Sequence, residues 1–222
     1  MKNEVYIVAG GSSLRGFDFS SLDNKDTIVV NKSILDVPHP TYFITVDFTF
    51  LRKLGVHKLE SKDTTKVFIA CLHFPYIEEK DGRIVDTRFN LVYDLSDFDV
   101  IIKSRKVVGI GYQFKDFRNG LNSGFCALQL AVILGYTKIY LLGVDLCFNV
   151  DNGLSNKSTH YHGGYGENIT SFNKKLSIYY DYFADGIHEL KCNPYINVEV
   201  ISLSPISRLN NIIEYVDYRK VL

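Results

Sequence analysis

Short apolar stretches bounded by polar turns recur along most of the chain. Seven of them are short and rich in β-branched residues, as is typical of strands: Val5–Ala9, Thr27–Val30, Tyr42–Thr45, Val67–Cys71, Lys106–Ile110, Ile139–Leu142 and Val198–Leu203. Helical spacing is strongest over Ser123–Leu134 and Phe172–Phe183, and helices are also expected over Phe48–Leu54 and Leu209–Tyr218. The alternation predicts an α/β fold: a Rossmann-like, mostly parallel sheet with helices on both faces, formed by residues 1–222 as a single domain.

Two stretches do not follow this alternation. Tyr76–Phe98 carries many charges and few periodic signals, and no element is predicted there. The segment from Asn149 to Thr170 is rich in Gly, Asn, Ser and His. Because a loop of this length in a compact domain usually serves a function, we expect a lid or substrate loop over residues 149–170.

The segment between Asn122 and Asp145 predicts a binding site most directly. Asn122 or Ser123 can cap the helix that follows, because a short side-chain oxygen accepts from the free N–H groups of a first turn. The same helix end attracts anions. Gly135 ends the helix, and Asp145 follows the buried strand Ile139–Leu142 at the sheet edge where α/β folds bind ligands. The segment therefore predicts a nucleotide site.

A second candidate for this site follows the first predicted strand. It consists of Gly10, Gly11, Ser12 and Ser13. Two glycines let the backbone approach a phosphate closely, and two hydroxyls add donors. The spacing matches neither the dinucleotide fingerprint nor a P-loop, so an ordinary turn between a strand and a helix is the alternative.

Two further polar residues follow predicted strands. Asn31 comes directly after Thr27–Val30 and can bond a base or a ribose, because its amide offers both a donor and an acceptor. Asp47 follows Tyr42–Val46 in a similar position. The alternatives are a turn residue for Asn31 and a helix cap for Asp47.

A pair of histidines provides candidate acid–base chemistry. In an extended segment His160 and His162 point to one side and Tyr161 points to the other. Histidine titrates near neutrality and is the usual general base. Two histidines are too few to hold a metal without a partner such as Asp145, and a solvated polar loop is the remaining interpretation.

Composition narrows the class of protein. Lys plus Arg and Asp plus Glu both number 25 among 222 residues, which argues against a dedicated nucleic-acid binder. Four cysteines without a CxxC pair, at positions 71, 126, 147 and 192, indicate reduced, buried thiols. No apolar run reaches the roughly 18 residues that span a bilayer, and no signal peptide is recognised. We therefore expect a soluble, cytoplasmic protein. The sequence does not determine the oligomeric state, and a homo-oligomer is one of the alternatives.

Several blocks together resemble the family 42 bacterial sialyltransferases. The blocks occur in the same order as in that family, and they are Val8–Leu14, Val30-Asn31, Asn122–Phe125, Leu134–Asp145, His160-Tyr161 and Leu203–Glu214. The Ser-Gly start of the helix, the LGYTKIYLLGVD strand and the Ser-Pro-Ile-Ser turn are the specific parts. A wider resemblance connects the GVDL strand end and the later histidine to pyrophosphokinase-like proteins of the hydroxymethylpterin type.

The resemblance implies a Rossmann-like domain that binds a CMP-sugar donor without a metal and transfers the sugar to a hydroxyl acceptor. By position, Asn31 and the turn 10–13 would hold the nucleotide, and Ser123 and Gly124 would meet its phosphate or ribose. Tyr161 would donate to the leaving phosphate. The family's base is a histidine, for which His162, or failing that His160, is available here.

The sequence departs from the family pattern at four positions. The family's nucleotide-binding Asn is here Gly10, a later Asn is Asp47, a Tyr is Cys147, and the base His aligns by spacing with Gly164. Two alternatives to the transferase therefore stay open. One is a Mg²⁺-dependent phosphotransferase of the pyrophosphokinase type that uses Asp145 and Asp47. The other is a catalytically inactive nucleotide-binding protein.

Overall fold

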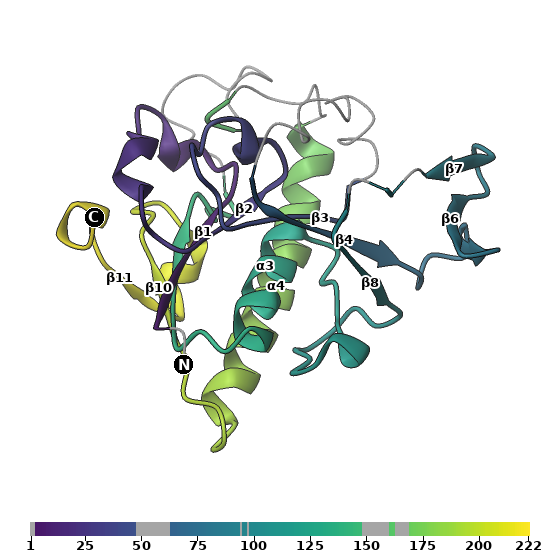
Figure 1. Ribbon diagram of the computed structural model, residues 1–222. Coiled ribbons are helices and arrows are strands. Elements are labelled where there is room, and N and C mark those ends of the chain that lie inside the picture. The colour runs from purple at the N-terminus through teal and green to yellow at the C-terminus, as the bar shows by residue number, and fades with distance from the viewer. Residues whose placement is uncertain (1–2, 48–62, 94, 97, 148–159, 163–168) are drawn as a thin grey trace.

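An eight-stranded sheet forms the centre of the protein. A computed structural model describes residues 3–47, 63–93, 95–96, 98–147, 160–162 and 169–222 (Figure 1). The strands are β1 (Glu4–Val8), β2 (Thr27–Val30), β3 (Tyr42–Thr45), β4 (Thr65–Cys71), β8 (Val100–Ser104), β9 (Lys138–Leu142), β10 (Glu199–Ser202) and β11 (Glu214–Tyr215). Their order is β11-β10-β9-β1-β2-β3-β4-β8, and every neighbouring pair is parallel. The predicted parallel α/β sheet is thus confirmed.

The direction of chain progression reverses at β1. From β1 the chain proceeds outward through β2, β3, β4 and β8, and it then returns to place β9 on the other side of β1. Val8 of β1 lies opposite Leu142 of β9, so the residues after each strand are also neighbours. A reversal of this kind leaves a crevice at the carboxyl ends of the strands.

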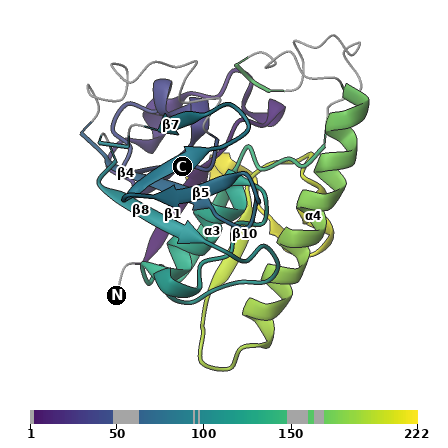
Figure 2. The same cartoon turned by 90° about the vertical axis from the view of Figure 1, so that its right-hand side faces the viewer.

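Two α-helices cover one face of the sheet. Helix α3 (Ser123–Ile133) packs directly on β1, β2 and β3, and α4 (Ile169–Cys192) packs on the outer side of α3 (Figure 2). Every residue of α3 from Ser123 to Val132 is buried, as expected for a helix that is apolar on all sides. Phe125 and Phe183 join the helices in an edge-to-face contact with ring centroids 5.4 Å apart. Both helices confirm predicted segments, although α4 is longer than predicted.

Short 3₁₀ helices cover the opposite face in the described part of the chain. They are η1 (Ser12–Leu14), η2 (Phe19–Leu22) and η3 (Asn31–Leu35). Their apolar side chains, such as Leu14, Leu22 and Ile34, pack on Tyr6 and Phe43 of the sheet. The central strands β1, β2, β3 and β9 are therefore buried on both faces, which explains why they are almost uniformly apolar.

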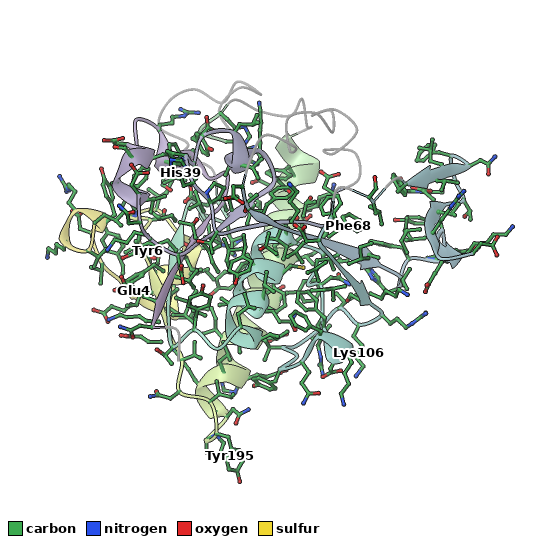
Figure 3. All side chains as sticks on the ribbon, in the orientation of Figure 1. Glu4, Tyr6, His39, Phe68, Lys106 and Tyr195 are labelled. Atoms are coloured by element: carbon green, nitrogen blue, oxygen red, sulfur yellow. The ribbon has the colours of Figure 1, made fainter. Side chains whose placement is uncertain are left out.

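The charged stretch Tyr76–Phe98 folds into a small antiparallel sheet of its own. Its strands are β5 (Ile77–Lys80), β6 (Arg83–Asp86) and β7 (Leu91–Tyr93), in that order. Asp81 and Gly82 connect β5 to β6 with φ values of 51° and 74°, as a two-residue type I′ turn requires. The sheet lies beyond β4 and β8 (Figure 1), and Ile77 and Ile84 pack on Phe68 of β4, which Figure 3 labels.

Two predicted elements are wrong. Lys106–Ile110 is not a strand, because the preceding Val100–Ser104 pairs with β4 and Gly109 adopts a left-handed φ of 82°. Leu209–Tyr218 is not an α-helix. The chain instead forms the 3₁₀ helices η7 (Arg208–Asn211) and η8 (Tyr218–Lys220), because β11 between them finds its backbone partners on the open edge of β10.

The remaining expectations from the sequence concern the helix Phe48–Leu54, the lid 149–170, the cysteines and the absence of a membrane span. A further 3₁₀ helix, η4, covers Phe114–Asp116. The predicted helix Phe48–Leu54 and most of the predicted lid 149–170 lie outside the described residues. The four cysteines are free thiols. Cys71 and Cys126 are buried, as predicted, whereas Cys147 is only partly buried and Cys192 is exposed. Within the described residues, no helix combines the length and the apolar character needed to cross a membrane.

Candidate functional site

A cleft of about 130 Å³ opens where β1, β2 and β9 end and α3 begins. Eight of the residues that the sequence singles out line it: Gly10, Gly11, Asn31, Asn122, Ser123, Gly124, Asp145 and His160. They come from five separate segments of the chain. The carboxyl ends of parallel strands meet at one edge of a sheet, so the fold itself brings these residues together.

Asp145 fixes the turn that follows β1. Its carboxylate is 3% exposed and accepts from the backbone N–H of Ser13 at 2.9 Å, the hydroxyl of Ser13 at 2.6 Å and the hydroxyl of Ser204 at 2.7 Å. Burial raises the pKa of Asp145, and the hydrogen bonds from Ser13 and Ser204 oppose that shift. The carboxylate therefore ties β1, β9 and the segment after β10 together. Ser12 and Ser13 lie behind the cleft and do not line it.

The two glycines of the turn are required by close packing. A Cβ atom at Gly11 would lie 2.5 Å from Cγ of Asp145. A Cβ atom at Gly10 would lie 2.8 Å from Cδ2 of His160 and 3.0 Å from Nε2 of His162. Gly10 therefore makes room for the histidines, which gives a structural reason for the departure from the family pattern at this position.

Asn31 is held in an unusual backbone conformation at the cleft. Its φ is 52°, in the left-handed region that Asn tolerates better than most residues. Its side-chain Oδ1 accepts from the hydroxyl of Thr45 at 2.7 Å, and that hydroxyl in turn accepts from the backbone N–H of Asp47 at 2.9 Å. The Nδ2 group of Asn31 donates to no other described residue, so it remains available to a ligand in the cleft.

The start of α3 supplies further donors. Asn122 caps the helix by accepting from the backbone N–H of Phe125 at 3.0 Å. The hydroxyl of Ser123 accepts from the backbone N–H of Val46 at 3.2 Å, which ties the helix to the end of β3. The backbone N–H groups of Ser123 and Gly124 have no acceptor among the described residues. Together with the helix dipole, they make this side of the cleft suited to an anion.

The histidine segment pairs with the turn after β1. Gly11 and His160 form an antiparallel bridge, and the backbone N–H of Tyr161 donates to the carbonyl of Gly10 at 3.1 Å. The rings of His160 and His162 stack with centroids 5.1 Å apart. The predicted placement of both histidines on one side of the segment is confirmed. His160 lines the cleft, and His162 stacks on it beside Gly10.

Tyr161 points away from the cleft. Its hydroxyl donates to Asp36 at 2.7 Å, and its ring lies 5.4 Å from that of Phe19. The structure therefore does not bring this hydroxyl to the position expected for a ligand of the leaving phosphate.

Burial dominates the electrostatics of His160. It lowers the pKa of the imidazole to about 3, and the positive charges of His162 and Lys32 act in the same direction. The ring is therefore neutral at pH 7. An anion bound in the cleft would raise this pKa again, because an opposite charge favours the protonated ring.

Asp47 and Asp145 do not face the same space. Asp47 lines a neighbouring cavity of about 620 Å³, whereas Asp145 borders the small cleft with its carboxylate engaged by two serines. Among the described residues, no group of three or more His, Cys, Asp or Glu side chains is placed to hold a metal ion. The carboxylate pair needed for the Mg²⁺-dependent alternative is therefore not assembled from these two residues.

Some residues of the cleft were not predicted. Phe172, Leu176 and Tyr179 of α4 line it, and their spacing of four and three positions marks one face of a helix. That spacing is visible in the sequence, but it does not reveal what the face covers. The role of Ser204 depends on the long-range approach of β10 to β9, which no local pattern shows.

Two solved glycosyltransferase structures resemble this chain over almost its whole length. The Maf glycosyltransferase from Magnetospirillum magneticum AMB-1 matches 99% of this chain with a TM-score of 0.52 and 14% identity. The sialyltransferase CstII from Campylobacter jejuni, solved with the substrate analogue CMP-3FNeuAc, matches 97% with a TM-score of 0.52 and 16% identity. This chain shares its fold with glycosyltransferases.

The two matches differ in how much of the other protein they cover. The chain covers 86% of the Campylobacter protein, but only 34% of the Magnetospirillum protein. No family model and no curated protein matches the chain. At these identities, the likeness establishes the fold alone.

Proposed function

We propose that this chain is a glycosyltransferase that moves a sugar from a nucleotide-sugar donor to a hydroxyl acceptor on a glycan. A CMP-type donor with a sialic acid-like sugar is the favoured choice, because the sequence blocks that resemble the family 42 sialyltransferases border the cleft. The observation that carries the proposal is the convergence, in one space, of a neutral histidine and several donors that have no acceptor among the described residues. The donors are the N–H groups of Ser123 and Gly124 and the Nδ2 group of Asn31.

The cleft suits the leaving group of such a reaction. The start of α3 favours negative charge, so the donor phosphate would lie against Ser123 and Gly124. These donors are fixed before the reaction and stabilise the charge that develops as the bond from the sugar to the phosphate breaks. Nδ2 of Asn31 would bond the ribose or the base.

The histidine pair would remove the acceptor proton. In the proposed step the acceptor oxygen attacks the anomeric carbon, and the phosphate departs with the electron pair of the broken bond. The proton of the acceptor hydroxyl passes to an imidazole nitrogen of the pair, with His160 facing the cleft. The phosphate charge raises the pKa of His160 from about 3, which makes the ring a stronger base when the donor is bound.

A ligand screen tests the nucleotide part of the proposal. Thermal unfolding is measured with CMP, CDP, UDP, GDP, ATP and AMP, each with and without Mg²⁺. A ligand at 100 times its Kd adds about 2.7 kcal/mol to the free energy of unfolding. Stabilisation by CMP without Mg²⁺ is the expected result. Binding of ATP that requires Mg²⁺ would support the phosphotransferase instead.

A charge change at Asn31 shows whether the ligand binds in this cleft. Asn31→Asp keeps the oxygen that accepts from Thr45 but places a carboxylate near the donor phosphate, so CMP affinity should fall about tenfold or more. Asn24→Asp is the matched control, because Asn24 also has a left-handed φ, of 61°, and lies on the surface. Equal CMP affinity in both variants would place the nucleotide elsewhere.

An inactive nucleotide-binding protein is the second candidate. The low pKa of His160 favours it, because a base with a pKa of about 3 is weak. Release of CMP from CMP-sialic acid in the presence of an acceptor glycan distinguishes the two, since a pure binding protein gives no turnover.

A further inference from the structure

A second and larger cavity lies beside the cleft and extends to the protein surface. Its volume is about 620 Å³, and it is enclosed by the end of β4, the small sheet β5–β7 and helix α4. Tyr179 of α4 lines both spaces, and Asp47 stands at the end of β3. The two spaces are therefore neighbours along the carboxyl edge of the sheet.

The wall of this cavity is built mainly from aromatic and aliphatic side chains. Phe74 and Tyr76 stack with ring centroids 5.1 Å apart, and the guanidinium of Arg88 lies 3.5 Å from the centroid of the Tyr76 ring. Surfaces of this kind receive the apolar part of a ligand and the C–H faces of sugar rings.

A buried carboxylate holds Arg88 in place. Asp86 is 2% exposed and accepts from the backbone N–H, Nε and Nη2 of Arg88 at 3.0, 3.0 and 2.7 Å. The Arg88 bonds hold the pKa of Asp86 below its usual range. Because Asp86 accepts these three hydrogen bonds, the Arg88 side chain is oriented before a ligand binds. The Nη1 group of Arg88 has no partner among the described residues. The wall therefore combines apolar surface with a fixed polar donor.

The rim of the cavity exposes two large apolar side chains. Phe89, between β6 and β7, is 64% exposed, and Ile178 of α4 is 44% exposed. They border the same cavity from different elements. Exposed apolar residues are unremarkable when scattered, but two on the rim of one cavity extend its apolar wall into solvent.

From these observations we infer that the cavity binds the acceptor, and that the acceptor is amphipathic: a sugar carried on an apolar aglycone. This inference rests on the proposed glycosyltransferase function. The sugar would lie near Tyr179, so that its hydroxyl reaches the small cleft, because an acceptor must approach the reacting carbon closely. The aglycone would pack between Phe89 and Ile178. Nη1 of Arg88 would donate to a sugar oxygen.

Binding of two simple glycosides tests the ligand class. The probes are p-nitrophenyl β-D-galactopyranoside and methyl β-D-galactopyranoside, which differ only in the aglycone, and binding to the full chain is measured by ligand-detected NMR. The aromatic glycoside should bind about tenfold more tightly, because its ring is removed from water. Equal affinities would overturn the inference.

Substitutions on the rim locate the binding. Phe89→Ser and Ile178→Ser should each weaken the aromatic glycoside about 3- to 10-fold and leave the methyl glycoside unchanged. Val92→Ser and Tyr195→Ser are matched controls. Val92 is 54% exposed on β7 but does not line the cavity, and Tyr195, 92% exposed, projects at the far end of the molecule (Figure 3). Rim variants that bind like the controls would overturn the inference.

The nucleotide provides the means to separate this inference from the proposed function. CMP affinity should be the same in the rim variants and the wild type. A loss of CMP affinity in Phe89→Ser would assign the cavity to the nucleotide base and overturn the acceptor assignment. If CMP binds and sugar transfer proceeds normally in both rim variants, the acceptor site is wrong and the function stands. If CMP does not bind at all, the proposed function fails, whatever the glycosides do.

Discussion

Gly10 and His160 fit together without space for a side chain between them. A Cβ atom on Gly10 would lie 2.8 Å from Cδ2 of His160. The backbones are joined as well, since the N–H of Tyr161 donates to the carbonyl of Gly10 at 3.1 Å. The turn after β1 and the histidine segment therefore behave as one unit of the cleft.

Gly10→Ala should disturb this unit. The added methyl group forces the imidazole of His160 to move, and overpacking of this kind typically costs about 1–3 kcal/mol of unfolding free energy. We expect a lower midpoint in urea and a shift of the His160 ring signals in NMR spectra. Unchanged ring signals would show that His160 does not pack against Gly10 in solution.

Asp145→Asn should mainly reduce stability. The amide can still accept one set of bonds, but its NH₂ group faces donors on Ser13 or Ser204 that already point at this position. Leaving such buried groups unpaired costs about 1–3 kcal/mol. A urea titration measures the loss, and a double-mutant cycle with Ser204→Ala should show coupling, since the two residues share a hydrogen bond. Strict additivity would contradict the structural role of Asp145.

The buried state of His160 predicts a stability that depends on pH. Its pKa in the folded state is lowered to about 3, whereas the unfolded chain takes up the proton near pH 6.5. Between these values the unfolded state binds one more proton, so His160 makes stability fall as the pH is lowered, by about 1.4 kcal/mol per pH unit. Above pH 6.5 this contribution is complete.

The comparison with His160→Gln isolates this effect. Asp145, whose pKa is raised by burial, contributes with the opposite sign as the pH falls, but it is present in both proteins. The unfolding free energy of the wild type minus that of the variant should therefore decrease steadily as the pH is lowered from 6.5 to 4.5. A constant difference would mean that His160 is not buried as a neutral ring.

The sequence predicts the cleft better than its surroundings. Gly10, Asn31 and Ser123 follow or precede buried elements, and the parallel sheet brings their positions together without any further information. Local patterns also predict α3 and β9, because helix caps, glycine and apolar runs act over a few residues. Both elements are therefore determined by residues that are close together in the sequence.

Features that depend on contacts between residues far apart in the sequence could not be predicted. Leu209–Tyr218 has helical spacing, yet the open edge of β10 captures Glu214–Tyr215 as β11. The position of Asp47 after β3 does not show whether its side chain borders the small cleft or the cavity beside it. The hairpin β5–β6 has a strong local turn signal in Asp81-Gly82. It was not predicted, because the many charged residues around this turn hide the alternation that is typical of strands.

The stacked pair His160 and His162 gives the most direct test of the proposed chemistry. The double variant His160→Gln, His162→Gln should lower kcat by roughly 10²–10⁴ and leave CMP affinity nearly unchanged, because a general base acts on the acceptor rather than on the nucleotide. Since His160 faces the cleft and His162 stacks on it, His160→Gln alone should account for most of the loss. His188→Gln, on the exposed side of α4, is the matched control. Normal turnover in the double variant would place the base elsewhere. Loss of CMP binding would instead identify the histidines as residues that hold the nucleotide, because removing a base leaves the ground-state complex intact.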